Sequence, residues 1–100
     1  MNLTSKQRAY LKGLASTQET IIHIGKGSVS PELVSAVSEA LGARELVKLG
    51  VLKNCADDPR EIAEVIAERT RSTVVHVIGK KIVLYKPAKD KEKAKIKLPL

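Results

Sequence analysis

The chain has 100 residues, of which 43% are hydrophobic and 29% charged, so it has the length of one domain and enough apolar side chains for a core. No apolar run approaches the roughly 20 residues of a membrane span, and the N-terminus lacks the apolar segment of a secretory signal. The single cysteine excludes an internal disulfide framework, which together with these features favours a cytoplasmic location.

The positive charge is unevenly distributed along the chain. Eighteen Lys and Arg residues against eleven Asp and Glu residues give a net charge of +7. Residues 79–100 hold eight lysines and two acidic residues, and residues 1–28 also carry a basic excess, whereas residues 29–78 are slightly acidic. This polarity favours a polyanionic partner. Basic residues also serve solubility, so composition alone leaves nucleic-acid binding and a merely solvated surface equally open.

The first predicted element is an amphipathic helix over residues 4–15. Thr4 and Gln7 have the spacing of a capping box, which predicts where the helix begins. Tyr10 and Leu11 lie on its apolar stripe. We therefore expect Tyr10 to be a core residue.

Two strand-helix pairs follow. The β-branched run 20–24 predicts a strand, and Ser30-Pro31 predicts the N-cap and first position of a helix that Gly42 ends. Residues 45–52 predict the second strand. Asp58-Pro59 then repeats the cap and proline pattern and starts a helix that reaches about residue 71.

The remaining residues predict a hairpin and a tail. Strands 73–78 and 81–85 are joined by Gly79-Lys80, a two-residue turn. The order α-β-α-β-α-β-β predicts an α/β domain with a four-stranded mixed sheet, since the helical crossovers favour parallel pairing and the hairpin is antiparallel. We place the domain at residues 1–87. Residues 88–100 are lysine-rich and are predicted to be flexible, with only their last few residues docking weakly.

The turn Gly25-Lys26-Gly27-Ser28 is the most informative motif, because it joins a strand to a well-capped helix. Glycines let the backbone approach a ligand, and the amides and dipole of a helix N-terminus favour an anion. A purely structural turn explains the motif about equally well. Ser30 stands where a dinucleotide fingerprint needs its third glycine, and the Gly-Lys-Ser/Thr of an NTPase loop is absent, so a nucleotide cofactor is disfavoured.

The candidates for catalysis or metal binding are His23, His76 and Cys55. Each histidine lies between β-branched neighbours, as is typical of a packed or half-exposed structural side chain. The spacing of these residues matches no zinc motif. We therefore expect neither enzymatic activity nor a metal or cofactor.

Several motifs, in order and spacing, resemble the single-domain, YhbY-type members of the CRM (chloroplast RNA splicing and ribosome maturation) family. The matching segments are Leu3–Arg8 with Leu11-Lys12, Ile24–Gly27, Glu45–Lys48, Val77–Lys80 and Val83–Pro87. Together they span the whole predicted domain.

The resemblance implies a fold similar to the C-terminal domain of translation initiation factor three and RNA binding through a GxxG loop. In bacterial members it implies association with precursor large ribosomal subunits. The family loop usually ends in glycine, where this chain has Ser28. If the family geometry requires a positive φ at that position, serine adopts it only at a cost in energy. Either the loop differs slightly here or the hydroxyl of Ser28 contributes a contact to phosphate.

The predicted RNA-binding surface combines the turn with cations from both ends of the chain. Its residues are Lys6, Arg8, Lys12, Gly25, Lys26, Gly27, Ser28, Lys80, Lys81 and Lys86. Each cation alone is more often a solvated surface charge. With only two aromatic residues, recognition by stacking on several rings is disfavoured, so we expect contacts to the RNA backbone.

We therefore expect a monomer that binds ribosomal RNA of the precursor large subunit. One alternative is a protein-interaction module on the ribosome that uses the acidic face of the third helix. The other is a general RNA-binding adaptor without a dedicated role in assembly.

Overall fold

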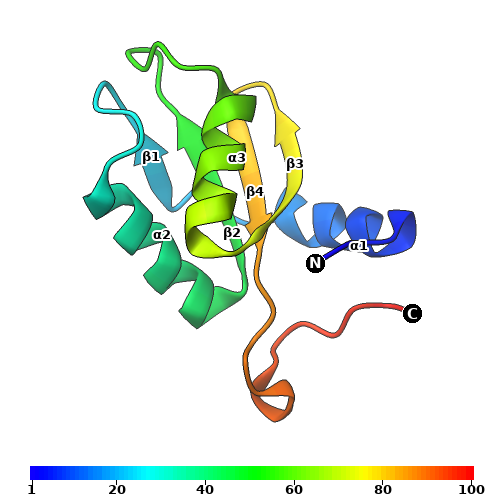
Figure 1. Ribbon diagram of the computed structural model, residues 1–100. Coiled ribbons are helices and arrows are strands. Elements are labelled where there is room, and N and C mark those ends of the chain that lie inside the picture. The colour runs from blue at the N-terminus through cyan, green and yellow to red at the C-terminus, as the bar shows by residue number, and fades with distance from the viewer.

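The computed structural model describes residues 1–100 as three α-helices and four strands in the predicted order (Figure 1). The elements are α1 Ser5–Ser16, β1 Ile22–Ile24, α2 Pro31–Arg44, β2 Leu46–Val51, α3 Pro59–Thr70, β3 Thr73–Ile78, β4 Lys81–Tyr85 and the short 3-10 helix η1 Lys91–Lys93. The predicted α/β class and the mixed sheet are confirmed. No helix combines the length and the apolar run needed to cross a membrane.

The four strands form one sheet in the order β1-β2-β4-β3. β1 pairs with β2 in parallel, and β4 is antiparallel to both of its neighbours. The carboxyl ends of β1, β2 and β3 therefore lie at the same edge of the sheet. We call this the loop edge; it consists of residues 25–30, 52–58 and 79–80 and is uppermost in Figure 1. We call the opposite end, where the chain leaves β4, the tail edge; it includes residues 43–45 and 86–100.

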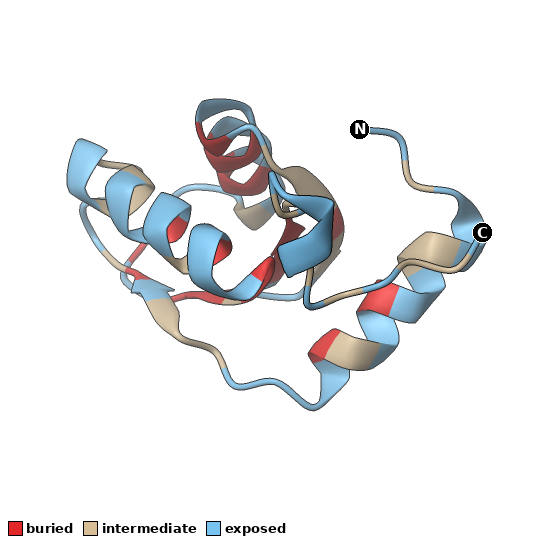
Figure 2. Ribbon diagram, turned by 90° about the horizontal axis from the view of Figure 1, so that it is seen from below, coloured by how far each residue is buried: buried red, intermediate tan, exposed pale blue.

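Helices cover the two faces of the sheet unequally. α2 and α3 pack on one face, where Val37, Leu41 and Ile66 join inward-facing strand residues in a cluster of 13 buried residues. α1 lies on the other face, where Leu11 and Ala15 belong to a second cluster of six buried residues. Figure 2 shows buried residues on the inner sides of the helices and exposed residues on their outer sides. Burial of these apolar faces is the main force that holds the layers together.

The cover that α1 provides is incomplete. Leu46, Val83 and Tyr85 lie under it and are buried. Nearer the loop edge, His23 and Lys81 point to the same face of the sheet and are exposed. We call this uncovered area the open sheet face.

The predicted helix starts are confirmed. The side chain of Thr4 accepts a hydrogen bond from the backbone N–H of Gln7, and the full capping box is present. Ser30 and Asp58 cap α2 and α3, each with proline just inside the helix. These side chains satisfy amides that have no partner within the helix.

Two local predictions were wrong. Gly42 does not end α2, which continues to Arg44 and stops where Glu45 takes a φ of 66°. The N–H of Glu45 still donates to Leu41, so the helical ladder runs past the glycine. Tyr10 is 42% exposed and is not a core residue, because α1 turns Leu11 toward the sheet and leaves Tyr10 on its flank.

The last residues of the chain make specific contacts at the tail edge. The carboxylate of Glu45 is buried, and its Oε2 accepts a hydrogen bond of 2.6 Å from the backbone N–H of Lys95. Ile96 and Leu98 pack against the cluster under α1. The boundary near residue 87 and the flexibility of the tail remain predictions.

Candidate nucleic-acid interface

The glycine turn is a hydrogen-bonded turn that leads into α2. The N–H of Ser28 donates to the carbonyl of Gly25 over 2.9 Å. Ser28 has a φ of 50°, in the left-handed region that costs a residue with a Cβ about 1–2 kcal/mol. Ser30 follows, and its Oγ accepts from the N–H of Leu33 at 3.1 Å. Ser28 thus occupies the conformation that glycine adopts most easily.

The two glycines differ in their surroundings. A Cβ on Gly25 would lie 3.6 Å from Oδ1 of Asn54, which is ordinary contact. A Cβ on Gly27 would meet nothing within 4 Å. Packing within the protein therefore gives no reason for glycine at position 27. A bare, exposed backbone at that point suits close approach by a ligand.

Three exposed lysines stand at equivalent places along the loop edge. Lys26, Lys53 and Lys80 each follow the last residue of a strand by two positions, in β1, β2 and β3 respectively. Since these three strands end at one edge, their lysines add to one positive potential there. Lys53 was missed by the sequence interpretation, although its position relative to the strand end is the signal that could have found it.

Backbone hydrogen bonds join the three segments that carry these lysines. The N–H of Leu52 donates to the carbonyl of Ile24 over 2.8 Å, which ties the end of β2 to the end of β1. The N–H of Val51 donates to the carbonyl of Lys80 over 2.7 Å, which ties the same strand to the hairpin. The arrangement of the loop edge is therefore set by the sheet itself.

The open sheet face continues the positive surface away from the loop edge. Nζ of Lys81 donates to Oγ1 of Thr20 over 3.1 Å. On β3, where His76 pairs with Val83, burial lowers the pKa of His76, and the nearby charges of Lys12, Arg60 and Arg8 lower it further. Burial and these charges keep the His76 side chain neutral to a lower pH. The carboxyl residue Glu64 lines the same hollow as Arg8, Arg60 and His76, so this place carries charges of both signs.

Two other predicted site residues are Arg8, which lies near His76, and Lys86. Arg8 donates from Nη1 to the carbonyls of Val74 and Val75, over 2.8 and 2.6 Å, where β3 has a register irregularity. Lys86 lies at the tail edge, where its Nζ donates to the carbonyl of Thr70 over 3.0 Å. Both side chains have structural partners in the free protein.

Lys6 is exposed on α1, which packs on the sheet with Leu11 and Ala15. Lys6 lies five residues before Leu11, which places it about 140° away around the helix. Since Leu11 faces the sheet, Lys6 projects away from it. The structure therefore joins Gly25–Ser28 with Lys80 and Lys81, places Lys12 and Arg8 near His76 on β3, and leaves Lys6 and Lys86 apart from them.

Acidic residues border the glycine turn on its other side. A hollow between the turn and α3 is lined by Gly27, Ser28, Val29, Ile62 and Val65, together with the carboxyl residues Asp57 and Glu61. A phosphate approaching from this direction would be repelled. The electrostatics favour approach from the side of Lys53 and Lys80.

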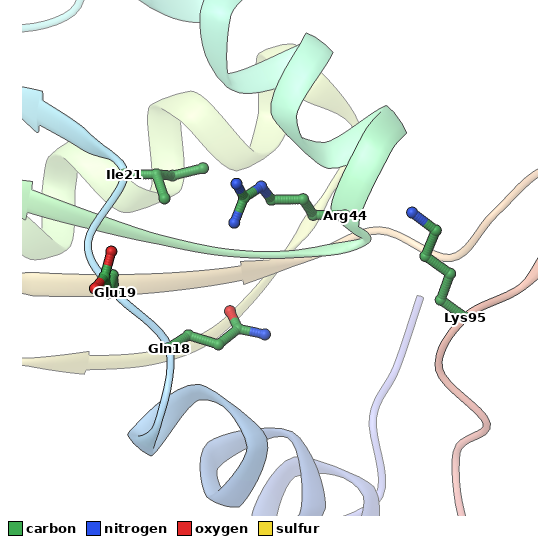
Figure 3. A pocket seen from close by; sticks show the side chains of 5 residues that line it. All are labelled: Gln18, Glu19, Ile21, Arg44 and Lys95. Atoms are coloured by element: carbon green, nitrogen blue, oxygen red, sulfur yellow. The ribbon is translucent and has the colours of Figure 1, made fainter.

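The tail edge has a hollow of a different character (Figure 3). It is lined by Gln18, Glu19, Ile21, Arg44 and Lys95. Carboxylate, guanidinium and ammonium groups share it, so it does not present charge of a single sign.

Burial and the charge of Glu45 raise the pKa of Tyr85. No group of three or more His, Cys, Asp and Glu residues is placed to hold a metal ion.

Proteins that are similar to this chain over nearly its whole length are named for RNA binding. The sequence model of the CRS1 / YhbY (CRM) domain matches residues 3–86. A Bacillus subtilis protein named "Probable RNA-binding protein YqeI" is 42% identical over 97 residues, which cover 97% of this chain and 99% of that protein. A Haemophilus influenzae protein named "RNA-binding protein" is 32% identical over 97 residues, covering 97% and 95%. The solution structure of a candidate RNA-binding protein from Staphylococcus aureus matches with a TM-score of 0.81 and 42% identity, covering 98% of this chain and all of that one.

Proposed function

The chain belongs to the CRS1 / YhbY (CRM) domain family, and on that premise we propose that it binds RNA through the loop edge. The observation that carries the proposal is the convergence of three exposed lysines on a turn whose Gly27 backbone is open to solvent. Amides at the start of α2 add partial positive charge at the same place. Proteins over 30% identical to nearly the whole chain are named for RNA binding.

The proposed contacts are mainly to phosphate. Lys26, Lys53 and Lys80 would neutralise backbone charge, and the turn would bring its amides close to one phosphate. Such contacts position RNA and carry little sequence information, so we expect modest sequence preference. Binding should weaken with added salt, with a slope of log K against log salt of about −0.7 for each contact to a single strand.

The proposed biological RNA is ribosomal RNA of the precursor large subunit, bound in the cytoplasm by a monomer. This part of the proposal rests on the resemblance to bacterial YhbY-type proteins. It predicts that the chain sediments with precursor large-subunit particles in a cell lysate and leaves them after treatment with high salt. A protein partner that still co-purifies with the chain after nuclease treatment would favour a protein-interaction module instead.

The binding proposal is tested by Gly27→Asp. The substitution places a carboxylate where phosphate would approach and adds a side chain to the bare backbone. We expect the affinity for ribosomal RNA to fall by about 30-fold or more, because like charges in a contact cost several kcal/mol. Lys26→Ala removes one contact and should weaken binding only about fivefold.

The matched control is Gly42→Asp, which adds the same charge at another glycine with open space around it, on α2 near the tail edge. It should leave RNA affinity nearly unchanged. All three variants should keep a cooperative thermal transition. If folded Gly27→Asp protein binds as tightly as Gly42→Asp protein, the turn is structural and the proposed site is wrong.

A further inference from the structure

A row of three residues crosses the open sheet face beside the loop edge. His23 on β1 pairs with Gly50 on β2, and Gly50 pairs with Lys81 on β4. Register partners point to the same face of a sheet, so these three positions form a continuous strip. The strip lies on the α1 face, where His23 and Lys81 are exposed.

Gly50 is unusual because it is a buried glycine near the end of β2, where the strand is paired on both sides. A Cβ there would lie 3.2 Å from Nζ of Lys81 and 3.4 Å from Cδ2 of His23, and 3.1 Å from Cγ2 of Thr20. Glycine within a strand weakens it and often marks close approach by another group. Here the missing side chain lets a cation and an imidazole ring converge over bare backbone.

The two side chains offer complementary contacts. Lys81 is held by its hydrogen bond to Thr20, which uses one of the three N–H donors of the ammonium group. The ring of His23 is exposed on the sheet face, whereas the ring of Tyr85 is buried under α1. His23 is also two residues before Gly25, or about 7 Å along the strand, so one RNA strand could contact both.

We propose that this row binds one unpaired nucleotide, whose base stacks on the His23 ring while Lys81 contacts its phosphate. The inference rests on the proposed function and adds a preference for single-stranded RNA. Histidine is among the side chains on which splayed RNA bases stack, and bases within a duplex are not free to do so. A single ring adds affinity at one position and does not replace phosphate contacts at the loop edge.

The test compares His23→Ala and His23→Phe on two probes, a ten-nucleotide single-stranded RNA and a blunt duplex of the same length. His23→Ala should weaken single-strand binding by about tenfold, the usual scale for loss of one stacked base, and should leave duplex binding within about twofold. His23→Phe keeps a ring without N–H groups, so it should retain single-strand affinity. His76→Ala is the control, since His76 is a half-buried histidine on β3, at the far side of the sheet from β1, and it should leave both affinities unchanged.

Three results would overturn the inference: unchanged single-strand binding by His23→Ala, equal losses on both probes, or a loss in His23→Phe as large as in His23→Ala. Its failure is distinguishable from failure of the proposed function. If the unmodified chain binds neither RNA, both proposals fail. If it binds and Gly27→Asp abolishes binding while His23→Ala does not weaken it, only the stacking contact is wrong. A thermal transition in each variant verifies folding, which an exposed position should not disturb.

Discussion

At the loop edge, Lys26, Lys53 and Lys80 extend into solvent from three turns, whereas at the tail edge Lys86 and Lys95 donate hydrogen bonds to backbone carbonyls. Lys86 binds the last residue of α3, and Lys95 binds a carbonyl in the last turn of α2 over 2.7 Å. The carbonyls that end a helix have no partner within it and carry the negative end of its dipole. A lysine in that position stabilises the fold.

The lysines at the two edges should therefore contribute differently to RNA binding. Lysines held by helix ends would have to give up those contacts before binding phosphate. Lysines that follow strand ends are exposed on a rigid frame and can bind without rearrangement. We therefore expect RNA affinity to depend on the loop edge and stability to depend on the tail edge.

The largest expected effect comes from reversing charge at one edge at a time. The loop-edge variant carries Lys26→Glu, Lys53→Glu and Lys80→Glu, and the tail variant carries Lys91→Glu, Lys93→Glu and Lys97→Glu. Both change net charge equally, and all six lysines are exposed. Loss of three contacts and added repulsion should weaken RNA binding about 100-fold or more in the first. In the second, only long-range attraction falls, so binding should weaken by about threefold.

Fluorescence anisotropy with labelled ribosomal RNA at fixed salt measures both variants. If the two variants lose RNA affinity by the same factor, binding follows net charge alone, and the proposed difference between the loop edge and the tail edge is wrong. The slope of log K against log salt gives a second measure of the difference. Its magnitude should fall by about two in the loop-edge variant and by much less in the tail variant.

A smaller effect is expected from deleting residues 89–100. The deletion removes the hydrogen bonds from Lys95 to Glu45 and Ala43 and the packing of Ile96 and Leu98. It should lower the free energy of unfolding by about 1–3 kcal/mol and leave a cooperative transition, because the two main clusters remain. Denaturant titration measures the change. Loss of the cooperative transition would show that the tail belongs to the core, and a tenfold loss of RNA affinity would show that the tail binds RNA.

The smallest expected effect concerns Ser28→Gly. Glycine adopts a φ of 50° without the penalty that serine incurs, so the free energy of unfolding should rise by up to about 1 kcal/mol, reduced by the greater freedom of the unfolded chain. RNA affinity should be unchanged or slightly higher. Weaker binding by the folded variant would mean that the hydroxyl of Ser28 contacts phosphate.

Local signals predicted most of the fold. The caps at Thr4, Ser30 and Asp58 act within one helical turn, so the sequence around each is sufficient to place a helix start. Tyr10 was misassigned because the apolar stripe shows which side of α1 is hydrophobic but not where the sheet ends beneath it. The end of α2 was misplaced because Gly42 keeps a helical backbone, and the positive φ that ends the helix is taken by Glu45, a residue with a side chain.

The site was predicted less completely, because it depends on the direction of each strand. Lys80 and Lys86 are close in sequence, but β4 runs between them and carries Lys86 to the opposite edge, about 17–20 Å along the strand. Lys53 is distant in sequence from the glycine turn and reaches it through parallel pairing of β1 and β2. A count of charged residues along the sequence shows neither that Lys86 is separated from Lys80 nor that Lys53 lies near the glycine turn.

The most direct measurement of the central claim is a titration of isotope-labelled protein with ribosomal RNA, followed by NMR. The account predicts the largest shifts in the amide signals of Gly25–Ser28 and of residues 53 and 80, with the signals of residues 89–97 nearly unmoved. The largest shifts at residues 89–97, with the signals of Gly25–Ser28 unmoved, would contradict it.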